Sequence, residues 1–176
     1  MVQEHPDRPD GLDDAQERFA VATSEGASEA RLSTLSQLLD KVRVQLKMDV
    51  VFVSQFSAGR RFFRHVRRGP GEPETVAVGG SDALEESYCQ RVVDGRLPQV
   101  IRSGRGHPVA TLLPATHAVG VGGHLSVPIV MPDGSVFGTV CCFSHRDMPW
   151  LSDRDADTLR GIAKLIAAHV KRHGHI

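Results

Sequence analysis

Apolar residues recur at helical spacing near both ends of the chain. In the first segment they lie three or four positions apart, with Arg31, Gln37, Lys41 and Gln45 between them, so one face of a helix carries them and the helix ends near Asp49. These apolar positions are Leu32, Leu35, Leu38, Leu39, Val42 and Leu46. The second segment carries a stripe of Leu159, Ile162, Ala163, Ile166 and Val170. The pattern therefore predicts a helix at each end of the chain.

The second helix has a recognisable start signal. Ser152 precedes the apolar stripe and is followed three residues later by Asp155, the spacing of a capping box. Acidic side chains in this first turn also favour the positive end of the helix. The sequence therefore predicts that the helix begins at Ser152.

Strand patterns fill much of the chain between the helices. Residues 50–56 form a short run rich in β-branched and aromatic side chains, which is typical of a strand. Ser57-Ala58-Gly59 can form a turn that leads into a second strand at 61–67, so the two runs indicate a hairpin. Residues 75–78 are expected to form a third short strand. The arginines and the histidine of residues 60–68 fit a charged edge strand that resists aggregation.

A second hairpin is the clearest in the sequence. Residues 125–131 and 136–143 are joined by Pro132-Asp133-Gly134-Ser135, which has the residues of a tight turn. Pro128 has no amide hydrogen to donate to a ladder, so we expect a bulge or an unpaired position there.

The segment between the hairpins has a mixed character. Residues 84–93 suit a short helix that ends at Gly95, and residues 98–101 suit a short strand. Residues 102–123 are rich in glycine and are expected to be irregular; a loop of that length is functional or disordered. The element order predicts an α+β fold with a central antiparallel sheet and the two terminal helices on one face.

Composition narrows the class of protein. The 176 residues suit one domain, which we expect over 27–176 after an acidic, disordered or loosely helical segment at 1–26. The formal net charge is zero, which gives no case for nucleic acid or membrane partners. The three cysteines form no disulfide or zinc pattern, and no signal peptide precedes the domain. We therefore expect a cytoplasmic protein.

Three stretches of the chain carry a family resemblance. They are Ser-Tyr-Cys-Gln-Arg-Val-Val-Asp-Gly-Arg-Leu-Pro at 87–98, Gly-His-Leu-Ser-Val-Pro-Ile at 123–129, and Asp-Gly-Ser-Val-Phe-Gly-Thr-Val-Cys-Cys-Phe at 133–143. With the element order, they make residues 32–170 resemble the GAF domains of bacterial signalling proteins, a family of small-molecule sensors. The resemblance implies a sheet of about six strands, with the helices on one face and residues 81–123 covering the other. It also implies a ligand beneath this cover, a homodimer through the terminal helices, and a signalling partner in trans.

Strand alternation selects the candidate pocket residues. Successive strand residues face opposite sides of a sheet, so His124 and Ser126 share one face while Leu125 and Val127 share the apolar, helix-covered one. Similarity to bilin-binding relatives implies that His124 and Ser126 face the ligand. The alternative is that His124 caps a strand end and Ser126 bonds to the backbone. The candidate binding residues are Phe52, Ser54, Tyr88, Cys89, His117, His124, Ser126, Cys141 and Phe143.

Other functions remain open beside the sensor. The sequence holds no nucleophile elbow, metalloprotease helix or paired-carboxylate motif, so no enzyme is expected, although Cys89 keeps open a redox switch or a reductase like the free methionine sulfoxide reductases. Cys141 and Cys142 point to opposite faces and are expected to pack in the core. His117 lies near the position of the iron ligand in haem-binding GAF sensors, so haem is a further alternative.

The cofactor itself stays unidentified. No cysteine occurs between Cys89 and Cys141, which excludes covalent bilin attachment at the loop position that phytochrome-like domains use. A dimerisation scaffold without a ligand is the last alternative.

Overall fold

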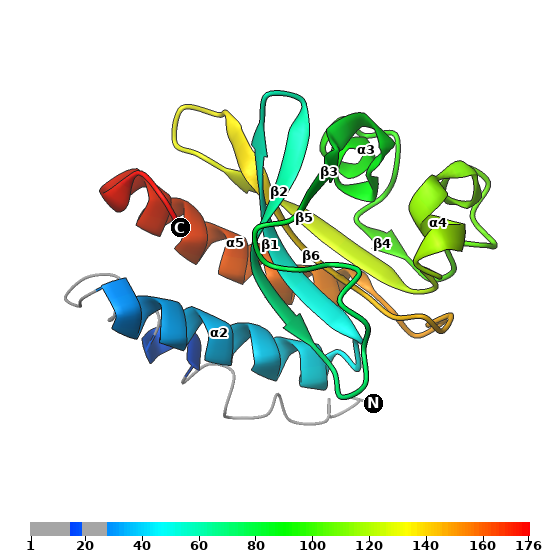
Figure 1. The fold of residues 1–176 in the computed structure, drawn as a ribbon, viewed down its shortest axis with the longest axis horizontal. Coiled ribbons are helices and arrows are strands. Elements are labelled where there is room, and N and C mark those ends of the chain that lie inside the picture. The colour runs from blue at the N-terminus through cyan, green and yellow to red at the C-terminus, as the bar shows by residue number, and fades with distance from the viewer. Residues whose placement is uncertain (1–14, 19–27) are drawn as a thin grey trace, which may run out of the picture.

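An antiparallel sheet lies at the centre of the computed structural model, which describes residues 15–18 and 28–176. In this described part of the chain, six strands pair in the order β3-β2-β1-β6-β5-β4 (Figure 1). The strands are β1 Val50–Ser57, β2 Arg60–Arg68, β3 Ser81–Ala83, β4 Val100–Ile101, β5 His124–Val130 and β6 Val136–Phe143. Both predicted hairpins are present, and the expected α+β class is confirmed.

Helices cover the two faces of the sheet unequally. The long helices α2 (Ser28–Gln45) and α5 (Asp153–His173) lie on one face, as predicted (Figure 1). The short helices α3 (Tyr88–Val93) and α4 (Pro114–Ala118) belong to the chain that covers the other face. Two 3₁₀ turns, η1 (Leu84–Glu86) and η2 (Ala110–Leu112), precede these short helices.

The core on the long-helix side is built from the predicted stripes. Its members include Leu35, Leu38, Leu39, Val42 and Leu46 of α2, Leu125, Val127 and Ile129 of β5, and Leu159, Ile162 and Ile166 of α5. The apolar face of α2 is thus buried within one subunit. The side chain of Leu32 lies outside the described residues, as does most of the segment 1–26, of which residues 15–18 are helical.

The caps of α5 follow the sequence signals. The backbone N–H of Ser152 donates to Oδ2 of Asp155 at 2.8 Å, which completes the capping box. At the other end, Gly174 takes the left-handed conformation with φ 79°, and its N–H donates to the carbonyl of Val170 at 2.7 Å. These contacts satisfy backbone groups at both ends of the helix and define where it begins and ends.

The third strand lies six residues later than predicted. Residues 75–78 run through turns, and the chain reaches β2 only where Phe63 exchanges backbone hydrogen bonds with Gly79 and Gly80. Gly79 has φ 83°, a conformation that turns the chain into the pairing register. Strand pairing therefore begins at Ser81, opposite Phe62.

Two further features refine the sequence reading. The long loop expected over 102–123 contains η2 and α4, whose few residues are too short for a periodic pattern to reveal. β4 pairs with His124 and Leu125 of β5, and the Ser126 N–H donates to the carbonyl of Gln99 just before β4, so Pro128 lies beyond this pairing. On the other side of β5, the register with β6 shifts between Ile129 and Val130. The predicted irregularity around Pro128 is confirmed. None of the described helices has both the length and the apolar character needed to cross a membrane.

Candidate functional site

A small cavity lies between the sheet and its cover. It has a volume of about 40 Å³, and residues of four strands, of α3 and of segment 115–121 line it. The lining residues are Phe52, Arg61, Val76, Tyr88, Ala115, Val119, Val121, His124, Cys141 and Phe143. A cavity of this size holds only about three water-sized molecules.

The strands reach this cavity by the predicted alternation. His124, Cys141 and Phe143 lie on the cover side, while Leu125 and Cys142 belong to the core beneath the long helices. Antiparallel pairing sets His124 opposite Phe143 and Ser126 opposite Cys141. The two strands therefore present His124, Ser126 and Cys141 together on one face, while Cys142 faces the long helices.

The structure gathers eight of the nine predicted binding residues on this face. Phe52, Tyr88, His124, Cys141 and Phe143 line the cavity, and Cys89, Ser54 and Ser126 are buried beside them. The Ser54 and Thr139 hydroxyls share a hydrogen bond of 2.9 Å. The ninth residue, His117, is exposed on α4.

The position of His117 does not favour the haem alternative. Its Nε2 atom lies 2.8 Å from the backbone carbonyl of Thr111, outside the cavity lining. An axial ligand needs a free ring nitrogen directed into the pocket. The side chain lies instead on the outer surface of the cover.

Arg61 is the cavity-lining residue that sequence reasoning missed. The charged-edge interpretation of β2 is wrong at this position, since Arg61 is only 7% exposed and lines the cavity. Its Nε donates to Oδ1 of Asp82 at 2.9 Å, its Nη2 donates to Oδ2 at 2.5 Å, and the guanidinium lies about 5 Å from the rings of Phe52 and Phe63. Its position two residues before the inward-facing Phe63 was the available signal, because residues two apart share a face.

Arg61 also contacts the sulfur of Cys89. The distance from Arg61 Nη1 to Cys89 Sγ is 3.0 Å. Burial alone would raise the pKa of this thiol, but hydrogen bonding from Cys141 and the positive charge of Arg61 lower it to about 5. Burial and the neighbouring Cys89 sulfur both raise the pKa of Cys141. The surroundings therefore favour the thiolate at Cys89 and the thiol at Cys141.

His124 is a neutral imidazole in this site. Its burial, reinforced by the charge of Arg61, lowers its pKa to about 3. Its Nε2 lies 3.1 Å from the sulfur of Cys141, and its ring lies 4.5 Å from that of Tyr88. The Tyr88 hydroxyl in turn bonds to the hydroxyl of Thr116, which joins α3 to α4 within the cover.

Two buried polar atoms of the site have no partner among the described residues. They are Nδ1 of His124 and Oγ of Ser126, in side chains that are 2% and 0% exposed. The alternative that Ser126 bonds to the backbone is therefore not met in this structure. Leaving a buried polar group unpaired costs about 1–3 kcal/mol, so these atoms favour a further partner.

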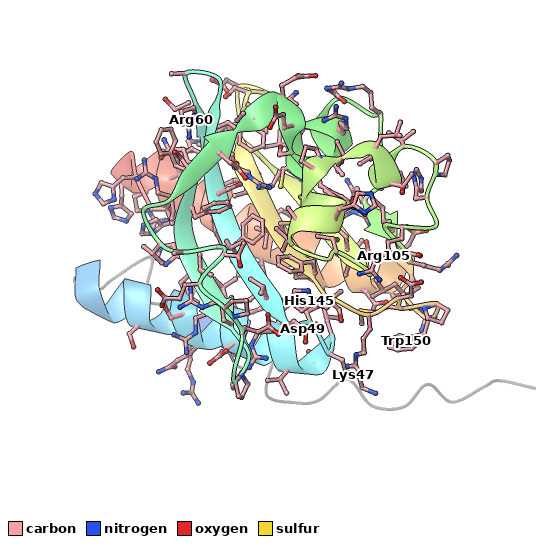
Figure 2. All side chains as sticks on the ribbon, turned by 45° about the vertical axis from the view of Figure 1, so that its right-hand side comes forward. Lys47, Asp49, Arg60, Arg105, His145 and Trp150 are labelled. Atoms are coloured by element: carbon pink, nitrogen blue, oxygen red, sulfur yellow. The ribbon has the colours of Figure 1, made fainter. Side chains whose placement is uncertain are left out.

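A second polar cluster lies at the end of the sheet near His145. One ligand atom from each of Asp49, Glu72 and His145 lies within 4.8 Å of the others, and Figure 2 shows Asp49 and His145 side by side. An imidazole with two carboxylates is a donor set that binds divalent cations. Here His145 Nε2 already pairs with Glu72 at 2.7 Å, and its Nδ1 pairs with the Gly120 carbonyl at 3.1 Å. The cluster joins three loops through its own contacts.

The curated proteins include a signalling enzyme that resembles this chain. Diguanylate cyclase DgcP of Escherichia coli (strain K12) is 23% identical over 154 residues, which cover 86% of this chain and 43% of that protein. The chain thus spans less than half the length of this curated relative.

Solved structures share the fold at low sequence identity. A putative GAF sensor protein from Burkholderia vietnamiensis has a TM-score of 0.65 at 17% identity, with 92% of each chain covered. The phycocyanobilin-bound GAF domain of a cyanobacterial phytochrome has a TM-score of 0.71 at 12% identity, covering 93% of this chain and 98% of that one. The free methionine-R-sulfoxide reductase of Neisseria meningitidis, in complex with its substrate, has a TM-score of 0.67 at 12% identity, covering 97% and 96%.

A family model provides the assignment. The model of the GAF domain matches residues 30–170, a span that contains the whole sheet and both layers packed on it. The chain belongs to the GAF domain family.

Proposed function

We propose that this GAF domain is a non-enzymatic sensor that binds a small molecule between the sheet and the cover of residues 81–123. One observation carries the proposal: His124 Nδ1 and Ser126 Oγ are buried without partners on the sheet face beneath this cover. A ligand with matching hydrogen-bonding groups would satisfy both atoms and recover the cost of burying them.

The size of the cavity implies that the cover moves on binding. A volume of about 40 Å³ is far below the 300 Å³ or more that pockets for small organic ligands have. The wall on the cover side consists partly of Ala115, Val119 and Val121, in and just after the five-residue helix α4. This short helix has few contacts to lose, so we expect its displacement to open the pocket.

The relatives support a ligand in this place without naming it. A phytochrome GAF domain of this fold holds phycocyanobilin, and a reductase of this fold holds its substrate. In this chain His124 is uncharged and Arg61 is paired with Asp82, so the pocket favours a polar ligand over a highly charged one. The identity of the ligand is the object of the experiment below.

We further propose that the terminal helices transmit the signal. Strands β5 and β6 carry cavity residues on one face, while their other face packs in the core beneath α2 and α5. A shift in these strands would therefore reach both long helices. In solution we expect a cytoplasmic homodimer through these helices, acting on a signalling partner in trans; the match to part of a diguanylate cyclase supports such a setting. The stripe of α2 is buried within the subunit, so its outer face, where Val44 is 64% exposed, has to supply the contact.

A thermal-shift screen tests ligand binding directly. The probes are free amino acids, nucleotides and haem, each at about 100 times an expected Kd, where binding adds about 2.7 kcal/mol to the stability. We expect at least one probe to raise the Tm of the wild type by several degrees and to leave that of His124→Leu unchanged. Val130→Ala, on an exposed position of the same strand, is the matched control and should keep the shift. The sensor proposal fails if no probe shifts the wild type, or if His124→Leu responds equally.

A further inference from the structure

We propose that Cys89 and Cys141 are a peroxide-sensitive thiol pair that closes into a disulfide between α3 and β6. This inference goes beyond the sensor proposal, because it needs no bound ligand and concerns covalent chemistry. It rests on the contacts of the two sulfur atoms, on the charge beside them and on the cavity that adjoins them.

The two thiols are neighbours in the fold although 52 positions separate them in the sequence. Both belong to one buried cluster: Arg61 Nη1 lies 3.0 Å from Cys89 Sγ, and Arg61 and Cys141 line the same cavity. Each thiol also shifts the pKa of the other. Helix α3 supplies one sulfur from the cover, and β6 supplies the other from the sheet. Two cysteines from different layers that share one buried cluster are the starting arrangement for a disulfide between those layers.

A buried cation activates one member of the pair. Arg61 donates to Cys89 Sγ at 3.0 Å while Asp82 holds the other side of its guanidinium. A thiolate, not a thiol, is the nucleophile toward a peroxide oxygen. The arrangement therefore makes Cys89 the attacking sulfur and leaves Cys141 as the resolving thiol.

The third cysteine provides an internal comparison. Cys142 is equally buried but lies in the opposite core, where it packs with the residues beneath the long helices. Burial raises its pKa, so it stays a thiol. The same polypeptide thus contains a neighbouring cysteine that the proposal predicts to be inert.

The reaction balances with a hydroperoxide as the oxidant. The Cys89 thiolate attacks one peroxide oxygen, an S–O bond forms, the O–O bond breaks, and the departing hydroxide takes the proton of the Cys141 thiol to become water. The Cys141 thiolate then attacks the Cys89 sulfenic sulfur, an S–S bond forms, and the S–O bond breaks with loss of hydroxide. Two sulfurs lose two electrons, and the peroxide gains them.

The cavity sets which oxidant can react. Cys141 lines the cavity directly, whereas Cys89 is 0% exposed behind it and beside Arg61. The volume of about 40 Å³ admits hydrogen peroxide but not a bulky organic hydroperoxide or glutathione. We therefore expect hydrogen peroxide to oxidise the folded protein much faster than cumene hydroperoxide does.

Mass spectrometry of the folded protein tests the pair. After treatment with hydrogen peroxide, the wild type and Cys142→Ser should each lose 2 Da. Alkylation in denaturant should then label only Cys142 in the wild type and no cysteine in Cys142→Ser, and both should yield a peptide cross-linked through Cys89 and Cys141. Cys89→Ser should stay reduced, and Cys141→Ser should gain 16 Da at Cys89. A disulfide through Cys142, or no mass loss in the wild type, would overturn the proposal.

The rate of oxidation separates activation by Arg61 from mere proximity. We expect Arg61→Met to react at least tenfold more slowly than the wild type, whereas Asp82→Asn, which keeps the guanidinium, should react at least as fast. The wild-type rate should fall by half near pH 5, where Cys89 becomes protonated. An equal rate in Arg61→Met, verified as folded by circular dichroism, would contradict the role of the cation.

The test is independent of the sensor proposal. The thermal-shift screen is run on the reduced wild type, in which no disulfide is present, so ligand binding is measured without oxidation and with every candidate binding residue in place. Disulfide formation without a ligand would support this inference alone. A ligand shift without oxidation would support the sensor alone.

Discussion

The two faces of the sheet differ in what they bury. The face under α2 and α5 is packed with aliphatic side chains that leave little polar surface to satisfy. The face under α3 and α4 buries Arg61, His124, Ser54, Ser126 and Thr139 among its apolar residues. Buried polar groups cost stability unless they are paired, so the first face is the main source of stability, and the polar content of the second is what the proposed ligand site rests on.

The largest expected effect lies on the apolar face. Leu38→Ala in α2 removes a fully buried side chain and leaves a cavity, which should lower the free energy of unfolding by about 3 kcal/mol. Urea denaturation measures the change. Oxidation of Cys89 and Cys141 should be unaffected while the variant is folded. A loss below 1 kcal/mol would show that this face is not the main source of stability.

Acid should destabilise the folded protein because His124 is buried in its neutral form. Its pKa is about 3 in the folded state and near 6.5 when exposed, so between these values the unfolded chain binds the proton more readily. The free energy of unfolding therefore decreases as the pH falls from 6.5 toward 3, by about 2 kcal/mol between pH 6 and pH 4. The check is urea denaturation at both pH values for the wild type and His124→Leu. The variant should lose less, and an equal loss in both proteins would contradict the neutral, buried state.

The sequence predicted the layers of this molecule better than the contacts between them. Periodicity located α2, α5 and both hairpins, and the two-residue repeat placed His124 and Cys141 on the cover face. Helix α4 was not predicted because five residues are too few to show a helical repeat of apolar positions. The contact of Cys89 with Cys141 depends on how the cover packs on the sheet, which no local pattern encodes.

Arg61 shows why a charge pattern can mislead. Alternation alone would turn Arg61 inward with Phe63, but the surrounding arginines favour an exposed strand. The inward position is tolerated because Asp82, Cys89 and two aromatic rings satisfy the guanidinium. Such compensation comes from four separate segments and appears only in the folded structure.

A smaller effect is expected at His145, which follows the end of the central strand β6. Burial alone would lower the pKa of His145, but hydrogen bonds to Glu72 and to the Gly120 carbonyl raise it above the usual value. The resulting stability is complete below about pH 6.5 and is lost as the pH rises through the raised folded-state value. His145→Gln should cost less than about 1 kcal/mol at pH 6, because the side chain is 35% exposed, and still less at pH 8. Thermal unfolding at the two pH values would contradict the ion pair if the cost were larger at pH 8.

The central claim is that the two unpaired polar atoms beneath the cover lower the stability of the ligand-free protein and are there to bind a ligand. The stability of one double variant tests this claim most directly. His124→Leu combined with Ser126→Ala removes both unpaired polar atoms and preserves apolar packing. Urea denaturation without ligand should show the double variant to be more stable than the wild type by about 1–3 kcal/mol. A double variant less stable than the wild type by a similar amount would mean that both atoms are satisfied within the protein, and it would contradict the account.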